Sequence, residues 1–450
     1  MKCLFCDENR TLSVAAMWSE IIEYLKDPSL VAQFQTFFGV KTHYTKNSED
    51  YGDKNLLSET RDINPHEFNH NTNNSLVDDE KSKVNGYTTV ERKYNNVTET
   101  VLRSQNEQQS SVKHFNYTIT NYFWYYLFLF GTQLGDEIFY STFIPFWFWN
   151  IDGAVGRRVV LVWAITMTTG QILKDIICWP RPACPPAVRL QSKWSEEYGM
   201  PSTHAMIGVS IPFSVVLFTM NRYIYPVSIG WTIAFLWCTL VCMSRLYLGM
   251  HTVLDIIAGL ILAIVLMIIL IPLVDITDYY ILSNVWVVAI LIAFSIGVIV
   301  YYPCSKKWTP TRGDTTMVVS VTTGIHVGAW LNYNTGVMVT PPTPPPYHII
   351  WPSYTMFGCM ILRTILGFCN ILAAKSICKS FSYGILCAIL KTNPKDLMRS
   401  QNYSENKYKV LVDLVYKYFY CFVIGVNTVY FLPNFFTMIG IERPSFYTEI

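Results

Sequence analysis

Long apolar runs are the feature that most restricts how this chain can fold. From Asn121 onward, about nine stretches approach the roughly 20 apolar residues that a helix needs to cross a bilayer. Charged residues make up only 15% of the chain, against about a quarter in an average soluble protein. The sequence therefore predicts an all-α, polytopic membrane helical bundle of about nine transmembrane helices. The expected spans cover residues 121–147, 154–174, 204–220, 227–247, 252–274, 281–302, 314–336, 355–374 and 413–433.

Ionisable residues inside two of these spans constrain how the helices face one another. Asp136 and Glu137 lie within 121–147, where a buried acid is costly unless it faces the protein interior. A helical hairpin in that stretch is the alternative to a single span. Arg363 lies inside 355–374 and needs a polar partner, for which Asp136 and Glu137 are the candidates.

The first 118 residues have a different composition from the rest of the chain. Residues 15–40 carry a weakly amphipathic pattern, which predicts a short helix on the membrane surface or against the bundle. Residues 45–113 are rich in Asn, Ser, Glu, Lys and Asp and hold few apolar side chains, so we expect them to be disordered. We expect a polar N-terminal region (1–118), a membrane core (119–302) and additional transmembrane helices (303–450).

Charge and cysteine content exclude several classes of partner. The net charge of +2 gives no basic excess of the kind that binds nucleic acid. The twelve cysteines form no paired CxxC set, and Cys3 and Cys6 stand alone at the N-terminus. A zinc site would need a second pair or histidines at ligand spacing. We therefore expect no metal and no cofactor, and the sequence leaves protein partners unknown.

Three clusters of reactive side chains stand at the ends of the apolar runs, and their order places them on one side of the membrane. Lys174 ends the second expected span and His204 begins the third; Arg245 ends the fourth and His251 begins the fifth. Loops that follow the second and fourth spans lie on the same membrane face, so the clusters can meet. The clusters are Lys174 with Arg181-Pro182, Pro201-Ser202-Thr203-His204, and Ser244-Arg245 with His251 and Asp255.

Phosphate ester cleavage needs the kinds of side chain that these clusters hold. The phosphoryl oxygens need positive charge, which Lys174, Arg181 and Arg245 can supply. Ser202 and nearby backbone amides at a helix start can add neutral donors. A single basic residue at a helix end is usually an interface anchor, so the specificity of the pattern comes from the combination.

Two histidines and one carboxylate complete the predicted chemistry. His251 and Asp255 are four residues apart and share one helical face. A carboxylate there can keep one imidazole nitrogen protonated and leave the other free to attack phosphorus. His204 is the candidate general acid for the leaving alkoxide, and water would then hydrolyse the phosphohistidine.

The three clusters resemble the signature of the lipid phosphate phosphatase superfamily, which includes glucose-6-phosphatase and the vanadium haloperoxidases. That signature usually has glycine where this chain has Thr203. The resemblance implies that Lys174, Arg181, Ser202, Thr203 and Arg245 form the phosphate site, that His251 is the nucleophile, that Asp255 is its partner and that His204 is the acid.

Four longer stretches resemble the sphingosine 1-phosphate phosphatase family: 131–140, 174–182, 198–206 and 244–259. This resemblance implies that the substrates are sphingosine 1-phosphate and related phosphorylated sphingoid bases, and that the membrane is that of the endoplasmic reticulum. Two alternatives stay open. One is a phosphatase or phosphotransferase acting on another lipid or isoprenoid phosphate, and the other is a non-catalytic membrane transporter or scaffold.

Basic residues in the connectors bear on which side of the membrane the site faces. Arg157 and Arg158 lie where the second expected span begins, at the end opposite the reactive clusters, and favour a cytosolic position for that side. Lys306, Lys307 and the Lys-rich connector 375–412 favour the reverse. We expect a multi-pass protein with its active site on the luminal face.

Overall fold

The computed structural model describes residues 8–44, 115–191, 193, 196–303, 309–391 and 407–449. Residues 41–118 form one unit, and the rest of the chain forms the other. Several expectations fall outside the described residues and stay predictions. They concern the Cys3–Cys6 pair, the disorder of 45–113, Lys306 with Lys307, and residues 392–406 of the connector 375–412. The first part of that connector is not a loop as expected, because residues 375–389 continue the helix that begins at Tyr354.

The N-terminal region begins with two helices, α1 (Glu8–Lys26) and α2 (Pro28–Phe37), where the sequence predicted one. The break is at Asp27, whose carboxylate accepts a hydrogen bond from the N–H of Ser29 and caps α2 just before the helix-starting proline. Two strands, β1 (Val40–Tyr44) and β2 (Phe115–Ile119), then pair in a small sheet that the sequence did not predict.

The larger unit is a helical bundle, as predicted. Every expected span contains a helix, but only five helices among the described residues are both long and apolar enough to cross a membrane, so the number nine is not established. These are α6 (Gly153–Ile177), α8 (Val227–Tyr247), α9 (Val253–Ser283), α12 (Tyr354–Ile389) and the continuous stretch Tyr408–Met438. The others are α4 (Tyr122–Gln133), α5 (Glu137–Asn150), α7 (Thr203–Thr219), α10 (Val285–Val300) and α11 (Thr311–Asn334).

Shorter elements complete the chain. The stretch Tyr408–Met438 comprises most of α14 (Lys407–Val426), the π-helical turn η1 (Asn427–Phe431) and α15 (Leu432–Met438). A 3-10 turn, η2 (Phe446–Thr448), follows it. Strands β3 (Tyr223–Ile224) and β4 (Tyr347–His348) run parallel and tie the α7–α8 connector to the Pro-rich connector before α12.

The first expected span is interrupted, and this corrects two expectations. Asp136 accepts from the N–H of Glu137, so the chain turns and restarts as α5 in place of one continuous helix. Asp136 also pairs with Lys193 at 3.2 Å. Arg363 does not bind the acids that we named as candidates. Its Nε donates to Asn150 Oδ1 at the end of α5 at 3.1 Å, and its Nη1 donates to the carbonyl of Ile441 in the C-terminal segment at 2.8 Å, because these neutral acceptors lie within its reach.

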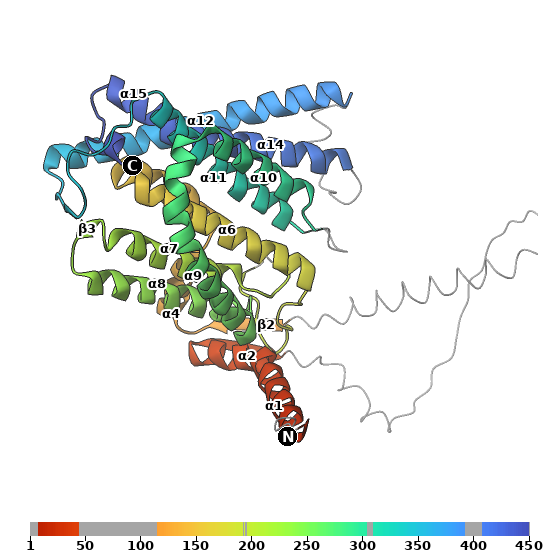
Figure 1. The fold of residues 1–450 in the computed structure, drawn as a ribbon. Helices are drawn as coiled ribbons and strands as arrows, with labels where there is room; N and C mark the ends of the chain where they lie inside the picture. The colour runs from red at the N-terminus through yellow and green to blue at the C-terminus, as the bar shows by residue number, and fades with distance from the viewer. Residues whose placement is uncertain are drawn as a thin grey trace, which may run out of the picture. The chain divides into compact units, whose positions relative to one another are not determined.

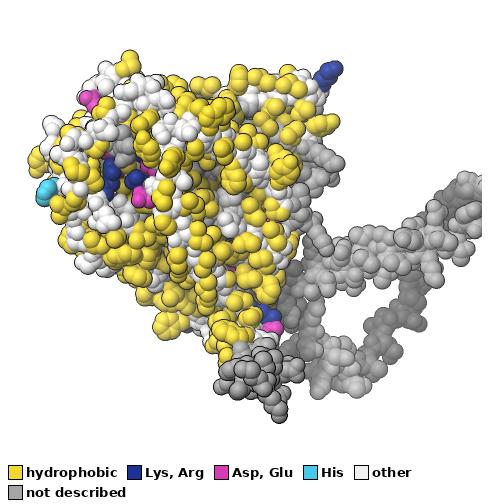
Figure 2. All heavy atoms as spheres, in the orientation of Figure 1, with side chains coloured by type: hydrophobic (Ala, Val, Ile, Leu, Met, Phe, Trp, Pro, Cys, Tyr) yellow, Lys and Arg dark blue, Asp and Glu magenta, His cyan; other side chains and the backbone are white. Residues whose placement is uncertain are grey.

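Helix α7 packs against α6, α8 and α9, and α11 packs against α6 and α14. Figure 1 shows α14, in blue, running beside α11, and α12 packs against α14. The approach of α11 to α14 depends on glycine: a Cβ at Gly324 would lie 2.2 Å from the carbonyl oxygen of Phe422. Figure 2 shows hydrophobic side chains over most of one face with few charged groups between them, as contact with lipid requires.

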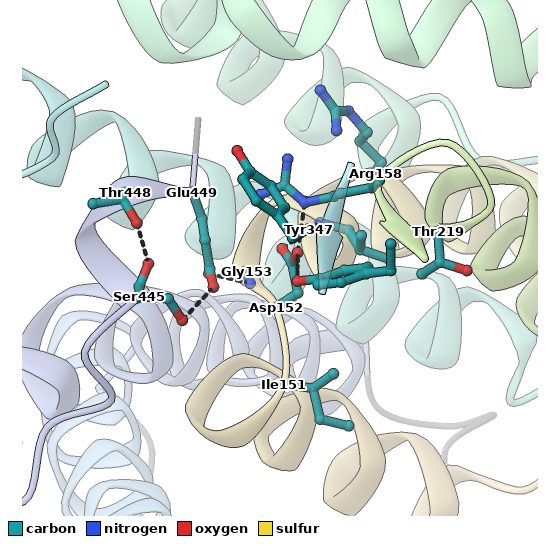
Figure 3. Close-up of polar contacts among 12 residues, drawn as sticks. Ile151, Asp152, Gly153, Arg158, Thr219, Tyr347, Ser445, Thr448 and Glu449 are labelled. Atoms are coloured by element: carbon teal, nitrogen blue, oxygen red, sulfur yellow. Dashed lines mark hydrogen bonds and ion pairs between the residues drawn. The ribbon is translucent and has the colours of Figure 1, made fainter. Parts of the chain in front are cut away.

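Buried charges form a paired network at the start of α6. Asp152 caps α6 and accepts from Arg222 Nε and from the hydroxyl of Tyr223, both at 2.6 Å. Figure 3 shows Glu449, near the C-terminus, reaching the N–H of Gly153. Arg157 pairs with Asp278 of α9 at 3.1 Å, and Arg443 pairs with Glu449. These contacts join α6, α9, the α7–α8 connector and the C-terminal segment.

Candidate active site

The predicted catalytic residues converge at the other end of α6. Lys174 lies in the last turn of α6, and Arg245 lies in the last turn of α8. His204 is the second residue of α7, and His251 lies two residues before α9. The helices that carry them pack on one another, and His251 lies within electrostatic range of Lys174, Arg181, Arg245 and His204. The structure therefore brings the three clusters into one site, as the order of the spans predicted.

His251 and Asp255 are held by the start of α9. The hydroxyl of Thr252 accepts from the N–H of Asp255, and Asp255 Oδ2 accepts from the N–H of Thr252 at 2.8 Å, which forms a capping box. The same Oδ2 atom lies 3.7 Å from His251 Nδ1, which is longer than a hydrogen bond. Neither ring nitrogen of His251 has a hydrogen-bond partner among the described residues. His251 and Asp255 therefore lie side by side, but the imidazole makes no hydrogen bond to the described residues.

Lys174 and Arg181 are connected through one acid that the sequence analysis missed. Lys174 Nζ donates to Glu197 Oε2 at 2.7 Å. Arg181 Nη2 lies 3.8 Å from the same oxygen, and its Nε donates to the backbone carbonyl of Glu197 at 2.8 Å. Arg181 Nη1 donates to the carbonyl of Met250, next to His251, at 2.8 Å. Arg181 therefore links Glu197 and Lys174 to the residue that precedes His251, the predicted nucleophile.

Arg245 is buried and only partly satisfied. Its Nη1 donates to Thr132 Oγ1 at 2.6 Å and to Gln191 Oε1 at 3.2 Å. Its Nε and Nη2 have no partner among the described residues. An arginine binds a phosphoryl group through two parallel N–H donors, so Arg245 retains the donors that a phosphate would use. Thr132 and Gln191 were not predicted as site residues.

Ser202 and Thr203 begin α7 and tie it to α9. Ser202 Oγ accepts from the N–H of Ala205, and the N–H of Ser202 donates to the carbonyl of Asp255 at 3.0 Å. The Thr203 methyl group packs toward Gly170 of α6, where an added Cβ would lie 3.1 Å from it. The start of α7 is therefore fixed against both α6 and α9. The side chain of Ser202 caps the helix, while that of Thr203 is packed, so a phosphate would meet Thr203 through its backbone.

The turn between α4 and α5 forms the wall beside His204. A Cβ at Gly135 would lie 2.9 Å from His204 Cδ2, so only glycine fits there without displacing the imidazole. Tyr140 donates to the carbonyl of Gly135 and holds the turn. The break in the first span therefore matters for the site. The turn at Gly135 fixes the position of the imidazole ring of His204, the predicted general acid.

Gln35, in α2, braces the site from the N-terminal region. Its Nε2 donates to the carbonyls of Val188 at 2.6 Å and Tyr247 at 2.8 Å, and its Oε1 accepts from the N–H of Val188 at 2.9 Å. Tyr247 ends α8, two residues after Arg245. The sequence signal for Gln35 is weak, since one glutamine in an amphipathic helix is ordinary. The structure shows that α2 contributes directly to the position of the loop between α6 and α7 (residues 178–202), called the site loop below.

Burial and charge determine the protonation of His251. Burial lowers the pKa of its imidazole well below the usual 6.5, and Arg181, Arg245 and Lys174 lower it further. The ring is therefore neutral at pH 7, which is the nucleophilic form. Among the described residues, His, Cys, Asp and Glu nowhere gather in a group of three or more that could hold a metal ion.

Comparison with known proteins decides the family. A model of the PAP2 superfamily matches residues 156–277. Sphingosine-1-phosphate phosphatase 1 of Rattus norvegicus is 38% identical over 319 residues, which cover 71% of this chain and 73% of the relative. The chain belongs to the sphingosine-1-phosphate phosphatase family. Sphingosine-1-phosphate phosphatase 2 of Homo sapiens is 33% identical over 72% of this chain and 80% of its own length, and no solved structure matches.

Membership of the sphingosine-1-phosphate phosphatase family confirms the resemblance that the motifs suggested. The plant lipid phosphate phosphatase delta of Arabidopsis thaliana is 31% identical over 44% of this chain and 49% of the relative. All eight predicted site residues, from Lys174 to Asp255, lie inside the PAP2 match. Gln35, Thr132 and Gly135 lie outside it, so the site extends beyond the region that the superfamily model describes.

Proposed function

We propose that the chain hydrolyses sphingosine 1-phosphate and related phosphorylated sphingoid bases to the free base and inorganic phosphate. One observation carries the proposal: buried, neutral His251 has both ring nitrogens unpartnered among the described residues, within range of three basic side chains. The rat and human relatives, named for sphingosine 1-phosphate, supply the substrate class. The bilayer in which the bundle sits is the source of that lipid.

In the first half-reaction, Lys174, Arg181 and Arg245 neutralise the phosphoryl oxygens. A ring nitrogen of His251 attacks phosphorus, and the P–O bond to the sphingoid alcohol breaks as the N–P bond forms. His204 gives its proton to the leaving alkoxide. The products are a phosphohistidine and the free sphingoid base.

In the second half-reaction, a water molecule attacks the phosphohistidine and loses a proton to His204. The N–P bond breaks, inorganic phosphate leaves, and His251 returns to its neutral form. Asp255, 3.7 Å from Nδ1, stabilises the positive charge that the ring carries while it is phosphorylated. His204 is again protonated and ready for the next turnover.

We infer that the reaction uses no metal ion and no cofactor, because three basic side chains do the electrostatic work that a metal would do. Activity is expected to persist in EDTA. Orthovanadate, which adopts the geometry of the pentacoordinate phosphoryl group, is expected to inhibit. A rate abolished by EDTA and restored by a divalent ion would contradict the inference.

The test is phosphate release from sphingosine 1-phosphate by detergent-solubilised wild type and His251→Ala, with phosphatidic acid as the comparison substrate. Cleavage of the sphingoid phosphate that is lost in the variant supports the mechanism and the substrate class. Preference for phosphatidic acid would indicate that the substrate is another lipid phosphate. Equal effects of wild type and His251→Ala on cellular sphingoid phosphate would support a transporter or scaffold.

We also propose that the protein resides in the endoplasmic reticulum membrane with the active site facing the lumen. The family resemblance supports the compartment, and Arg157 with Arg158 at the opposite end of α6 supports the orientation. Cys184 is exposed in the site loop and can report on it. In a variant whose only cysteine is Cys184, a membrane-impermeant maleimide is expected to label sealed microsomes only after permeabilisation. Labelling before permeabilisation would reverse the orientation.

A further inference from the structure

Glu197 places a carboxylate among the basic residues of the phosphate site, and the mechanism above does not use it. Its side chain is 9% exposed, and Oε2 lies 2.7 Å from Lys174 Nζ. The same oxygen lies 3.8 Å from Arg181 Nη2. One acidic oxygen therefore faces two of the three residues assigned to the phosphoryl group.

A carboxylate and a phosphoryl group cannot occupy this position together. Both are anions, and their repulsion is strong when they are a few ångströms apart in a buried site. Buried basic groups also need a counter-charge whenever no phosphoryl group is bound, because an unpaired buried charge is costly. A side chain that pairs with them at that stage must withdraw when the substrate arrives.

The backbone around Glu197 is anchored separately from its carboxylate. The backbone carbonyl of Glu197 accepts from Arg181 Nε at 2.8 Å, and the N–H of Gly199 donates to the carbonyl of Trp179 at 2.7 Å. A Cβ at Gly199 would lie 2.9 Å from the carbonyl oxygen of Pro180, so the loop is packed closely here. Rotation about the side-chain bonds of Glu197 can therefore move the carboxylate while the loop stays in place.

We propose that Glu197 is an internal substitute for the phosphoryl group: it pairs with Lys174 and Arg181 between turnovers and is displaced when a phosphate binds. This rests on the proposed function for the identity of the phosphate site. Displacement opposes the binding of every phosphate, so Glu197 weakens the hold on the product as well as on the substrate. Its effect is to favour the release of inorganic phosphate after each turnover.

The test is product inhibition in the full-length protein. Glu197→Gln keeps the size of the side chain and removes its charge, and the Ki for inorganic phosphate is expected to fall about tenfold, with a parallel fall in KM. Glu196→Gln is the matched control, because Glu196 is the exposed neighbour and its Ki should match wild type. Glu197→Asp keeps the charge but shortens the side chain by one methylene group, so its Ki should lie between those of wild type and Glu197→Gln.

An unchanged or higher Ki in Glu197→Gln, with a lower kcat at constant KM, would overturn the proposal and leave Glu197 as a support for Lys174. Phosphate-dependent thermal stabilisation provides a readout without turnover. Inorganic phosphate should raise the unfolding temperature of Glu197→Gln more than that of wild type, because it replaces the missing anion. A variant that fails to fold and is not rescued by phosphate would also contradict the proposal.

The two measurements separate this inference from the proposed function. If Glu197→Gln binds phosphate more tightly but the protein hydrolyses no lipid phosphate, the role of Glu197 as a substitute is supported and the proposed activity is contradicted. If the protein hydrolyses sphingosine 1-phosphate but wild type and Glu197→Gln bind phosphate equally, the proposed activity is supported and the role of Glu197 as a substitute is contradicted.

Discussion

Both ends of α6 lie beside buried charges, but the arginines at the start of the helix are paired with carboxylates, whereas Arg245 at the other end bonds only to neutral side chains. At the start of the helix, Asp152 is paired with Arg222 and Tyr223. The other end lies about 33 Å away, from the rise of 1.5 Å per residue between Asp152 and Lys174. There Arg245 donates only to the neutral side chains of Thr132 and Gln191, and its Nε and Nη2 have no partner among the described residues. Paired charges fix a structure, while unpaired donors in a buried site are available to a ligand. The difference supports the proposal that the end with Arg245 carries out the chemistry.

Equal substitutions at the two ends should have unequal effects on catalysis. Arg245→Lys keeps the charge and loses the forked donors, so kcat/KM is expected to fall about 100-fold. Arg222→Lys keeps a partner for Asp152 and should leave kcat/KM within about threefold of wild type. Steady-state phosphate release measures both. Similar losses in the two variants would remove the distinction between the ends.

When the charge is removed, the loss of stability should be larger at the start of α6 than at the active-site end. Arg222→Leu leaves the buried Asp152 carboxylate without its cation, which is expected to cost about 3 kcal/mol or more in the free energy of unfolding. Arg245→Leu loses bonds only to the neutral side chains of Thr132 and Gln191, so its loss should be smaller. Thermal unfolding in detergent compares them. A larger loss in Arg245→Leu would contradict the comparison.

The brace from α2 should affect the active end at a distance. Gln35→Leu removes three hydrogen bonds to the site loop and to α8, so kcat is expected to fall about tenfold as the loop loses its position. Gln33→Leu is the control, because Gln33 is exposed on the same helix. Equal kcat values for the two variants would show that α2 does not position the site.

The smallest expected effect is in the pH profile. The reactive form of His251 is the neutral ring, and its pKa lies below the usual 6.5 because of burial and three basic neighbours. The acid limb of kcat/KM should therefore lie below pH 6.5 in wild type. Arg181→Gln removes one positive charge and should move the limb upward, whereas Arg222→Gln should not move it. A limb above pH 6.5 in wild type would mean that another group controls it.

The order of the spans was enough to predict the convergence of the catalytic clusters, because helices that cross a membrane alternate in direction. The same reasoning could not identify Glu197 or Gln35. Each lies in a segment whose position is set by tertiary packing, and neither belongs to a spaced motif. Arg363 is a different case. The sequence correctly predicted that it needs a polar partner, and the partners are Asn150 and a backbone carbonyl. One sequence could not identify them, because it does not show which segments lie next to each other.

The interrupted first span shows why the number of membrane helices was harder to predict than their positions. Apolar content continues through 121–147, yet Asp136 caps a new helix and Gly135 packs against His204. A local capping signal and the shape of the site outweighed the apolar run. The fold class was predictable from composition, while this break required knowledge of what lies beside it.

Trapping the phosphorylated enzyme tests the central claim most directly. Wild type mixed with sphingosine 1-phosphate labelled with ³²P, and quenched in alkali within the first turnover, should carry protein-bound phosphate that is stable in base and labile in acid. His251→Asn should carry none, and Arg222→Lys should match wild type. Label on His251→Asn, or turnover by wild type without any bound label, would contradict a phosphohistidine on His251.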